Sequence, residues 1–261
     1  MNRKEQYEFG RVINSNITAL TLQETIDAIE KWILNKTNDY VCVCNTHSLV
    51  TASNDKLFEK VLLNAGICTP DGMPLVWALK LYGYSNQDRV DGPNLMLRLC
   101  EISAKKNYKV FLYGGTTETL EQLEKELKRR YEGINIVGSY SPPFRPLNDD
   151  EEMKIVEMIN NSGADLTFVS LGCPKQEIWM YNQKDRIRGT MLGVGAAFEF
   201  IIGNIKRPPL ILQKLGLEWC FRLISEPKRL WKRYAYNNPV YVYRFLKTYR
   251  KNKTYTIKMN K

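Results

Sequence analysis

The sequence contains a single histidine, His47, and six cysteines that never form a Cys-x-x-Cys pair. A zinc site built from cysteine and histidine is therefore not expected. No stretch of 18 apolar residues occurs, which argues against a membrane-spanning helix. The first ten residues are polar and charged, unlike a signal peptide. The sequence also lacks a Gly-x-Gly-x-x-Gly motif and a Walker A loop, so NAD binding and ATP hydrolysis have little support.

Positive charge is concentrated at the C-terminal end of the sequence. The 261 residues include 38 Lys and Arg against 28 Asp and Glu, a net charge of +10. Residues 1–205 carry a net charge of −3, whereas residues 206–261 hold 15 basic residues, two acidic ones and a net charge of +13. Such a basic end segment is typical of contact with a polyanion, either phospholipid or nucleic acid.

Short apolar runs alternate with amphipathic stretches through the first two hundred residues. The runs are rich in Val, Ile, Phe and Tyr, as in strands covered on both faces, and predict strands at 40–45, 108–113, 134–139, 165–171 and 190–194. Apolar spacing and capping residues predict helices between them, at 21–35, 117–131, 149–161 and 175–187. This alternation favours an α/β fold with a mostly parallel sheet.

Ligands of parallel α/β sheets bind beyond the carboxyl ends of the strands. The loops after the expected strands are therefore candidate binding sites. They read Asn45-Thr46-His47, Gly114-Gly115-Thr116, Gly172-Cys173-Pro174-Lys175-Gln176 and Gly195-Ala196-Ala197.

Two charged loops contain candidate catalytic side chains. Asp71 lies in Thr69-Pro-Asp-Gly-Met-Pro, where an aspartate before glycine is most often only a turn residue. Arg89 begins Arg89-Val-Asp-Gly-Pro-Asn, and an arginine there could face a phosphate or a carboxylate. The simpler interpretation of that loop is a helix cap at Asp91 or Asn94.

Three further candidates have ordinary structural explanations. Gly114 and Gly115 precede an expected helix, where glycine lets backbone N–H groups approach a phosphate, although many Gly-Gly turns are only tight connections. Gln176 lies in the first turn of an expected helix, where a solvent-facing side chain is the simplest expectation. His47 has no visible partner and is more often a structural hydrogen-bonding residue than a base. None of these residues identifies a reaction alone.

Taken in order, the loop motifs resemble those of the WecG/TagA/CpsF family of glycosyltransferases. Each motif is weak alone, but their joint order is specific and extends over most of the chain. The motifs are Thr69-Pro-Asp-Gly-Met-Pro, Arg89-Val-Asp-Gly-Pro-Asn, Tyr113-Gly-Gly, Leu171-Gly-Cys-Pro-Lys-Gln-Glu, Gly193-Val-Gly-Ala-Ala-Phe-Glu, Lys206-Arg-Pro-Pro, Gln213-Lys-Leu-Gly-Leu-Glu-Trp and Arg222-Leu-Ile-Ser-Glu-Pro-Lys-Arg.

The resemblance implies a Rossmann-like α/β fold, with helices on both faces of the sheet and a C-terminal appendage. It implies an inverting transfer of a sugar, N-acetylmannosamine or another hexose, from a UDP-sugar to an undecaprenyl-diphosphate-linked sugar. The product would belong to teichoic acid, capsule or exopolysaccharide synthesis. Asp71 matches the family's base, and Arg89 and Gln176 match functionally important residues. Asp91 and Glu199 stay open as alternative bases.

The sequence contains no Asp-x-Asp triplet, which many nucleotide-sugar transferases use to hold a divalent cation. We therefore expect a metal-independent mechanism without a cofactor, in which N–H donors and cations stabilise the leaving UDP. The expected donor- and nucleotide-binding residues are Asn45, Thr46, Gly114, Gly115, Gly195, Ala196, Arg207, Arg222 and Arg229.

The composition changes near Arg207-Pro208-Pro209, which predicts a boundary between a catalytic domain, residues 1–205, and a helical appendage, residues 206–261. The appendage mixes aliphatic and aromatic residues with basic ones, as in amphipathic helices at a bilayer surface. A core-packing helix would explain the aliphatic residues but would not need 13 net positive charges. We expect the appendage to hold the protein, as a peripheral cytoplasmic enzyme, on the anionic inner face of the bacterial plasma membrane.

Two other properties follow from the same observations. Apolar neighbours of Cys42, Cys44 and Cys100 predict buried free thiols in a reducing cytosol. An exposed apolar tail could also associate into a homodimer or homotrimer. The alternative function is a non-catalytic nucleotide-binding module whose basic aromatic tail binds single-stranded nucleic acid. The acidic body and the apolar content of the tail favour lipid, so no nucleic-acid partner is expected.

Overall fold

A computed structural model describes residues 7–260, with the side chain of Lys214 left aside. Its larger sheet has the strand order β4-β3-β8-β7-β5-β6, and the pairings of β3 with β8, β8 with β7, β7 with β5 and β5 with β6 are parallel. The strands are β3 (Asp39–Cys44), β4 (Ile67–Pro70), β5 (Lys109–Gly114), β6 (Asn135–Tyr140), β7 (Leu166–Ser170) and β8 (Thr190–Gly193).

The five expected strands are all present, each within one residue of its predicted start. Every residue of β3, β4 and β8 is buried, which is the reason these segments read as continuous apolar runs. The sequence did not predict β4 as a strand. Thr69 and Pro70, which were expected in a turn, continue the strand up to Asp71.

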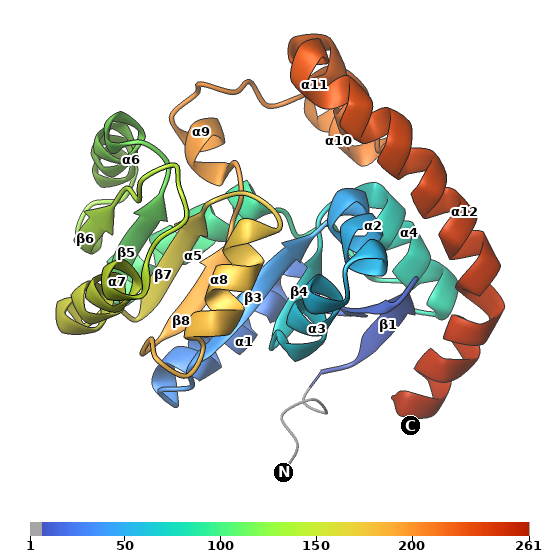
Figure 1. The fold of residues 1–261 in the computed structure, drawn as a ribbon, viewed down its shortest axis with the longest axis horizontal. Helices are drawn as coiled ribbons and strands as arrows, with labels where there is room; N and C mark the ends of the chain where they lie inside the picture. The colour runs from blue at the N-terminus through green and yellow to red at the C-terminus, as the bar shows by residue number, and fades with distance from the viewer. Residues whose placement is uncertain (1–6, 261) are drawn as a thin grey trace. The chain divides into compact units, whose positions relative to one another are not determined.

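Helices flank the sheet, as the predicted fold class requires. They include α1 (Leu22–Leu34), α5 (Gly92–Lys106), α6 (Thr117–Arg130), α7 (Asp149–Ser162), α8 (Lys175–Gln183) and the short α9 (Ala197–Ile201). Figure 1 shows α8 in front of β8 and α5 behind the neighbouring strands. Asn148 caps α7 in a capping box with Glu151, and α6 buries Leu120, Leu123 and Leu127.

The chain divides into two compact units. The first unit combines Met1–Leu22, Val43–Asp91 and Lys206–Lys261, and the second combines Gln23–Cys42 with Gly92–Ile205. One passage between units lies at Ile205. The division into a catalytic domain, residues 1–205, and an appendage, residues 206–261, stays a prediction. The C-terminal segment shares a compact unit with the Asp71 and Arg89 loops. Its association with membranes stays a prediction.

The first unit contains the hairpin of β1 (Phe9–Val12) and β2 (Ser15–Thr18) and several helices. These are α2 (Thr46–Asn54), α3 (Lys56–Asn64), α4 (Met73–Tyr82), α10 (Leu210–Lys214), α11 (Glu218–Ser225) and α12 (Pro227–Met259). Pro239 lies inside α12, which continues through this proline as one helix of 33 residues. Figure 1 shows α12, drawn in red, running past α2 and α4 toward β1.

Contacts with the rest of the first unit explain why α12 continues through a proline. A proline inside a helix removes one backbone hydrogen bond. On one side of Pro239, the Asn237 side chain meets His47, and on the other the Tyr241 hydroxyl donates to the Pro74 carbonyl oxygen, 3.0 Å away. Near its end, the buried Asn252 amide donates to the Ile13 carbonyl oxygen at 2.6 Å. These contacts stabilise the helical path on both sides of the proline.

The composition predicted buried thiols and argued against a membrane-spanning helix. Cys42, Cys44 and Cys100 are buried and form no disulfide bond, as predicted. Across residues 7–260, no helix has both the length and the apolar character needed to cross a bilayer.

Candidate functional site

Asp71 and Arg89 are brought together at the end of β4, where the loop that contains Arg89 returns to the strand. The Asp71 N–H donates to the Cys44 carbonyl oxygen at 2.7 Å, which ties the end of β4 to the end of β3. The following loop returns to β4, because the Thr69 hydroxyl donates to the Val90 carbonyl oxygen at 3.0 Å and the Val90 N–H donates to the Pro70 carbonyl oxygen at 3.1 Å. Arg89 is therefore held directly beside Asp71.

Arg89 bridges Asp71 and the C-terminal segment. Its Nε and Nη2 atoms both donate to Asp71 Oδ1, at 3.1 and 2.9 Å. Its Nη1 atom donates to Glu218 at the start of α11 and to Gln213 Oε1 of α10, the latter at 3.4 Å. The predicted appendage thus takes part in orienting the arginine that contacts the predicted base.

The surroundings of Asp71 raise the pKa of its carboxyl group to about 6. Desolvation is the main cause, and the neighbouring Asp91 and Glu218 carboxylates add to it, while the Arg89 guanidinium acts in the opposite direction. A carboxylate with a pKa near 6 is a better proton acceptor than an ordinary aspartate and is still ionised at neutral pH. Burial disfavours the charge on Arg89, but Asp71, Glu218 and Asp91 together raise its pKa, so it remains a cation.

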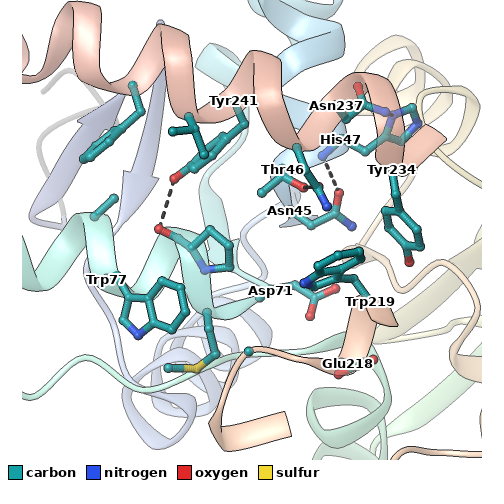
Figure 2. A pocket seen from close by; sticks show the side chains of 18 of the residues that line it. Asn45, Thr46, His47, Asp71, Trp77, Glu218, Trp219, Tyr234, Asn237 and Tyr241 are labelled. Atoms are coloured by element: carbon teal, nitrogen blue, oxygen red, sulfur yellow. Dashed lines mark hydrogen bonds between the residues drawn. The ribbon is translucent and has the colours of Figure 1, made fainter. Parts of the chain in front are cut away.

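A cavity of about 460 Å³ lies over Asp71 within the first unit. One part of its lining is polar and includes Asn45, His47, Asn237 and Arg233, together with Arg89 and Asp71. The other part is apolar and is formed by α4 and α12, with Met73, Trp77, Leu81, Tyr241, Val242, Phe245 and Leu246. Figure 2 shows Asp71 between Trp77 on one side and His47, Asn237 and Tyr234 on the other.

Asn45, expected to bind the donor, caps the helix that begins beside it. Its Oδ1 atom accepts hydrogen bonds from the N–H groups of His47 and Ser48, at 3.1 and 3.3 Å, and Ser48 completes the capping box. The Thr46 hydroxyl lies 3.5 Å from Asn238 Oδ1 of α12. Asn45 and Thr46 both line the cavity, so a ligand there would meet the start of α2.

The predicted arginines of the tail lie in different surroundings. The cavity lining, taken over residues 7–260, includes Arg222 but neither Arg207 nor Arg229. Arg207 forms an ion pair with the buried Asp91 at 3.0 Å. Arg229 is 59% exposed and pairs with Glu226 at 2.6 Å. Arg222 is the predicted tail arginine best placed to meet a ligand in this cavity.

Gln176, Gly114, Gly115, Gly195 and Ala196 belong to the second unit. Gln176 is buried, which contradicts the simple expectation of a solvent-facing side chain. Its Oε1 atom accepts from the Gly195 N–H at 3.2 Å, and its Nε2 atom donates to Glu177 Oε1 at 2.8 Å. A side chain on Gly193 would approach the Gln176 amide to 3.1 Å, so glycine leaves the room that this amide occupies.

The Gly114-Gly115 turn is hydrogen-bonded to the loop that contains Ser170, and Ser170 is in turn bonded to Gly195. The Gly115 N–H donates to the Ser170 carbonyl oxygen at 3.2 Å, and the Ser170 hydroxyl donates to the Gly195 carbonyl oxygen at 2.6 Å. Gly114 has a φ of +111°, and a Cβ there would lie 2.3 Å from the Ser170 carbonyl oxygen, so only glycine fits. Nucleotide binding by these loops stays a prediction, and it would have to use atoms other than the engaged N–H groups of Gly115 and Gly195.

The two alternative bases have partners of their own. Asp91 is buried against Arg207. Glu199 lies in the second unit, where it accepts hydrogen bonds from Thr119 Oγ1 at 3.0 Å and Asn204 Nδ2 at 2.8 Å. In the part of the chain that the structure describes, no group of three or more His, Cys, Asp or Glu side chains is arranged to hold a metal ion.

Sequence reasoning missed several cavity residues from the tail, which it treated as a surface segment. These are Glu218, Trp219, Arg233, Tyr234, Asn237, Asn238 and Tyr241. One available signal was the adjacent pair Asn237-Asn238. Asparagine is a poor helix former, so two of them inside a basic aromatic helix suggest a specific hydrogen-bonding role.

Comparison with known proteins agrees with these motifs. Residues 10–255 match the Glycosyl transferase WecG/TagA/CpsF family. The chain belongs to this family. It is 30% identical over 251 residues to the N-acetylglucosaminyldiphosphoundecaprenol N-acetyl-beta-D-mannosaminyltransferase of Bacillus subtilis (strain 168), an alignment covering 95% of this chain and 93% of that protein. This member of the WecG/TagA/CpsF family is therefore a glycosyltransferase, as the sequence motifs predicted.

Proposed function

We propose that this glycosyltransferase moves a hexose from a UDP-sugar to a polyprenyl-diphosphate-linked sugar, with inversion, in the synthesis of a cell-surface polysaccharide. The observation that carries the proposal is the Asp71–Arg89 pair in the lining of a cavity that is polar on one side and apolar on the other. The name of the Bacillus subtilis relative, which specifies a diphosphoundecaprenol-linked acceptor, supports the acceptor class. N-acetylmannosamine is the first donor sugar to test.

Asp71 acts as the general base in this mechanism. Its carboxylate takes the proton of the acceptor hydroxyl as that oxygen bonds to the anomeric carbon of the donor sugar. The bond from this carbon to the UDP oxygen breaks at the same time, and the leaving diphosphate gains negative charge. Arg89 holds the carboxylate in position through Oδ1. Cationic side chains of the cavity, with Arg222 and Arg233 foremost, stabilise diphosphate charge.

The two-sided lining of the cavity suits an amphiphilic acceptor. A diphosphate and sugar fit the polar side, where Arg222, Arg233 and Asn237 lie. The first isoprene units of a lipid fit the apolar side between α4 and α12. Trp77 and Leu246 are 48% and 68% exposed, so that side is open to solvent and a longer chain can continue outward.

The outer surface of the C-terminal segment supports contact with a membrane. Leu210, Ile211 and Ile224 are each more than 70% exposed on α10 and α11. Basic side chains are exposed beside them and along α12, at Lys206, Lys228, Arg229, Lys232, Lys247, Arg250, Lys251 and Lys258. Exposed apolar and basic residues together favour an anionic bilayer surface, which is where a lipid-linked acceptor resides.

Replacement of the proposed base tests the reaction directly. Asp71→Asn should lower acceptor-dependent UDP release by about 10²–10⁴-fold, because a positioned base contributes that much. The assay would use a panel of UDP-sugars with a short-chain prenyl-diphosphate-GlcNAc acceptor. Asp55→Asn is the matched control, since the Asp55 side chain caps α3 and asparagine caps a helix equally well.

The pH dependence of the wild-type reaction gives a second test. Because Asp71 must be ionised to accept a proton and its pKa is raised to about 6, kcat/KM should rise with pH up to about 6 and then level off. Transfer that survives Asp71→Asn at near wild-type rate would move the base elsewhere, with Asp91 the next residue to replace. If no donor in the panel releases UDP with this acceptor, the proposed acceptor class is wrong.

A further inference from the structure

His47 is the sole histidine of the chain and lines the cavity from the first turn of α2. Figure 2 shows its ring next to Asn237, which lies on the facing helix α12. The two residues are 190 positions apart in the sequence. The role of this imidazole depends on which of its two nitrogens holds the proton, and the contacts of Asn237 determine that.

The Asn237 amide nitrogen donates both of its hydrogens. One goes to the Arg233 carbonyl oxygen at 2.7 Å, and because a carbonyl only accepts, the amide must present its nitrogen there. The same nitrogen lies 3.2 Å from His47 Nδ1, so Nδ1 accepts the second hydrogen. An imidazole that accepts at Nδ1 is neutral and holds its proton on Nε2.

The surroundings of His47 also favour the neutral ring. Burial is the main cause that lowers its pKa, to about 4, and the Arg233 guanidinium acts in the same direction. A hydrogen bond accepted at Nδ1 is lost when that nitrogen is protonated, so the Asn237 donor also favours the neutral ring. The Thr51 hydroxyl, 3.5 Å from Nδ1, lies on the same side of the ring as Asn237. Asn237 thus holds the ring at Nδ1, which leaves Nε2–H as its free donor.

The Nε2–H group is not sealed inside the protein. Within residues 7–260, His47 forms its hydrogen bonds through Nδ1 and its backbone, and Nε2 is not among the polar side-chain atoms that are buried without a partner. An unpartnered donor that is not sealed inside the protein, on a residue that lines the cavity, is available to a ligand there.

We propose that His47 binds a diphosphate oxygen through Nε2–H, as a neutral donor that works beside Arg233. The inference rests on the proposed function, in which both substrates contain a diphosphate. The cavity already holds the Arg89, Arg222 and Arg233 cations. A neutral donor adds a directed hydrogen bond to the diphosphate without adding positive charge near Asp71, whose carboxylate must keep its affinity for a proton. The diphosphate belongs either to the UDP moiety or to the lipid acceptor.

The test uses nuclear magnetic resonance of ¹⁵N-histidine-labelled protein that carries no histidine tag. The imidazole signals of such a sample come from His47 alone. The expected spectrum is that of a neutral ring with the proton on Nε2, unchanged between pH 8 and pH 5. UDP, farnesyl diphosphate and N-acetylglucosamine are then added separately. A shift of the Nε2–H signal with UDP assigns the donor diphosphate, a shift with farnesyl diphosphate assigns the acceptor, and N-acetylglucosamine should cause no shift.

Three results would overturn the proposal. The first is a proton on Nδ1, and the second is a charged ring at pH 7. The third is an Nε2–H signal that shifts with neither diphosphate compound, or that shifts with N-acetylglucosamine instead. The titration needs no turnover, so it is independent of the Asp71→Asn assay. A shifted signal in a protein without transferase activity would leave the diphosphate site standing and reject the reaction.

Substitutions separate binding from structure. His47→Phe should raise KM for the diphosphate substrate about tenfold with kcat within about twofold, because one hydrogen bond to the ligand is lost. His47→Gln, whose amide can donate from a similar position, should recover most of that loss. Thr51→Val removes only the longer contact to Nδ1 and should leave both KM and the Nε2–H signal unchanged. Equal KM values for His47→Phe and wild type would refute the role.

Discussion

At the residue scale, the neighbours of Asp71 decide what its carboxyl group can do. Oδ1 is occupied by two nitrogens of Arg89, and Asp91 and Glu218 lie close enough to raise its pKa. An isolated aspartate in a Pro-Asp-Gly turn would titrate well below neutral pH and would be a weak base. The chemistry proposed for Asp71 therefore depends on residues from three separate segments of the first unit.

Glu177 is a second perturbed carboxyl group, in the second unit. It is buried next to Gln176, and burial raises its pKa from 4.5 to about 7, against the hydrogen bonds from Gln176, from its own backbone and from Cys173. Its Oε2 atom has no hydrogen-bond partner. A protonated carboxyl group satisfies this environment better than a carboxylate does. Because Gln176 donates to it and accepts from Gly195, Glu177 helps to orient the amide.

The raised pKa predicts a stability difference that depends on pH. Between pH 4.5 and 7 the folded protein keeps a proton on Glu177 that the unfolded chain releases, so this group's contribution to stability falls as pH rises. Glu177→Gln lacks this dependence. Relative to wild type it should gain about 3 kcal/mol of unfolding free energy between pH 4 and pH 8.

Urea unfolding of both proteins at the two pH values measures this gain. Glu132→Gln, a replacement at an exposed position, serves as the control for loss of a carboxyl group. The difference in unfolding free energy between Glu177→Gln and wild type could instead be the same at pH 4 and pH 8. That result would show that the carboxyl group is not protonated in the folded protein.

At the scale of elements, α12 has two tasks within the first unit. Its N-terminal half lines the cavity with Arg233, Asn237 and Tyr241. Its C-terminal half packs on the β1–β2 hairpin, where the Arg11 N–H donates to Thr256 Oγ1 at 3.0 Å and the buried Asn252 amide donates to the Ile13 carbonyl oxygen. The anchored half thereby positions the half that lines the cavity.

Removal of the Asn252 amide should loosen the anchored half of α12. Asn252→Ala leaves the Ile13 carbonyl oxygen without its donor, at a cost of about 1–3 kcal/mol. Hydrogen exchange in the last turns of α12 and in β1 should become roughly 10–100-fold faster. Thr254→Ala is the matched control, because the exposed Thr254 hydroxyl bonds only to the Arg250 carbonyl oxygen of its own helix. Equal exchange in the two variants would contradict an anchoring role.

At the scale of the whole molecule, charge is divided very unevenly along the chain. Residues 206–261 have a net charge of +13, and the two acidic residues there, Glu218 and Glu226, are already in ion pairs. Among the described residues, Arg229 pairs with Glu226, whereas the exposed lysines of α12 form no ion pair with an acidic residue of their own segment. An anionic membrane would supply the missing negative charge, which is the basis of the proposed membrane contact.

Charge reversal on α12 tests this contact. The fourfold variant Lys228→Glu, Lys232→Glu, Lys247→Glu, Lys251→Glu should bind anionic liposomes at least roughly 30-fold more weakly in a sedimentation assay, since each basic residue contributes about 1 kcal/mol near the surface. Lys31→Glu, Lys36→Glu, Lys125→Glu, Lys154→Glu changes the total charge equally at exposed positions of the second unit. A comparable loss of liposome binding in both variants would show an effect of net charge. Unchanged liposome binding in both would reject the membrane contact.

The sequence alone determined the sheet and the family. Buried parallel strands leave a local signal, since both faces are covered and the apolar run is continuous, and five of the six strands of the larger sheet were predicted from it. The Asp71 and Arg89 motifs were equally visible, because each loop is a short contiguous segment with unusual Gly and Pro content. Their order along the chain sufficed to identify a glycosyltransferase family.

Only the tertiary structure decided which residues share the cavity. Glu218 reaches Arg89 across 129 positions and Asn237 reaches His47 across 190, and no local pattern reports contacts of that length. The sequence interpreted the tail as a surface segment because its charge dominates its composition, yet one face of α12 packs on α2, α4 and β1. Likewise, Pro239 should end a helix by its own chemistry, and packing on both sides of it keeps α12 continuous.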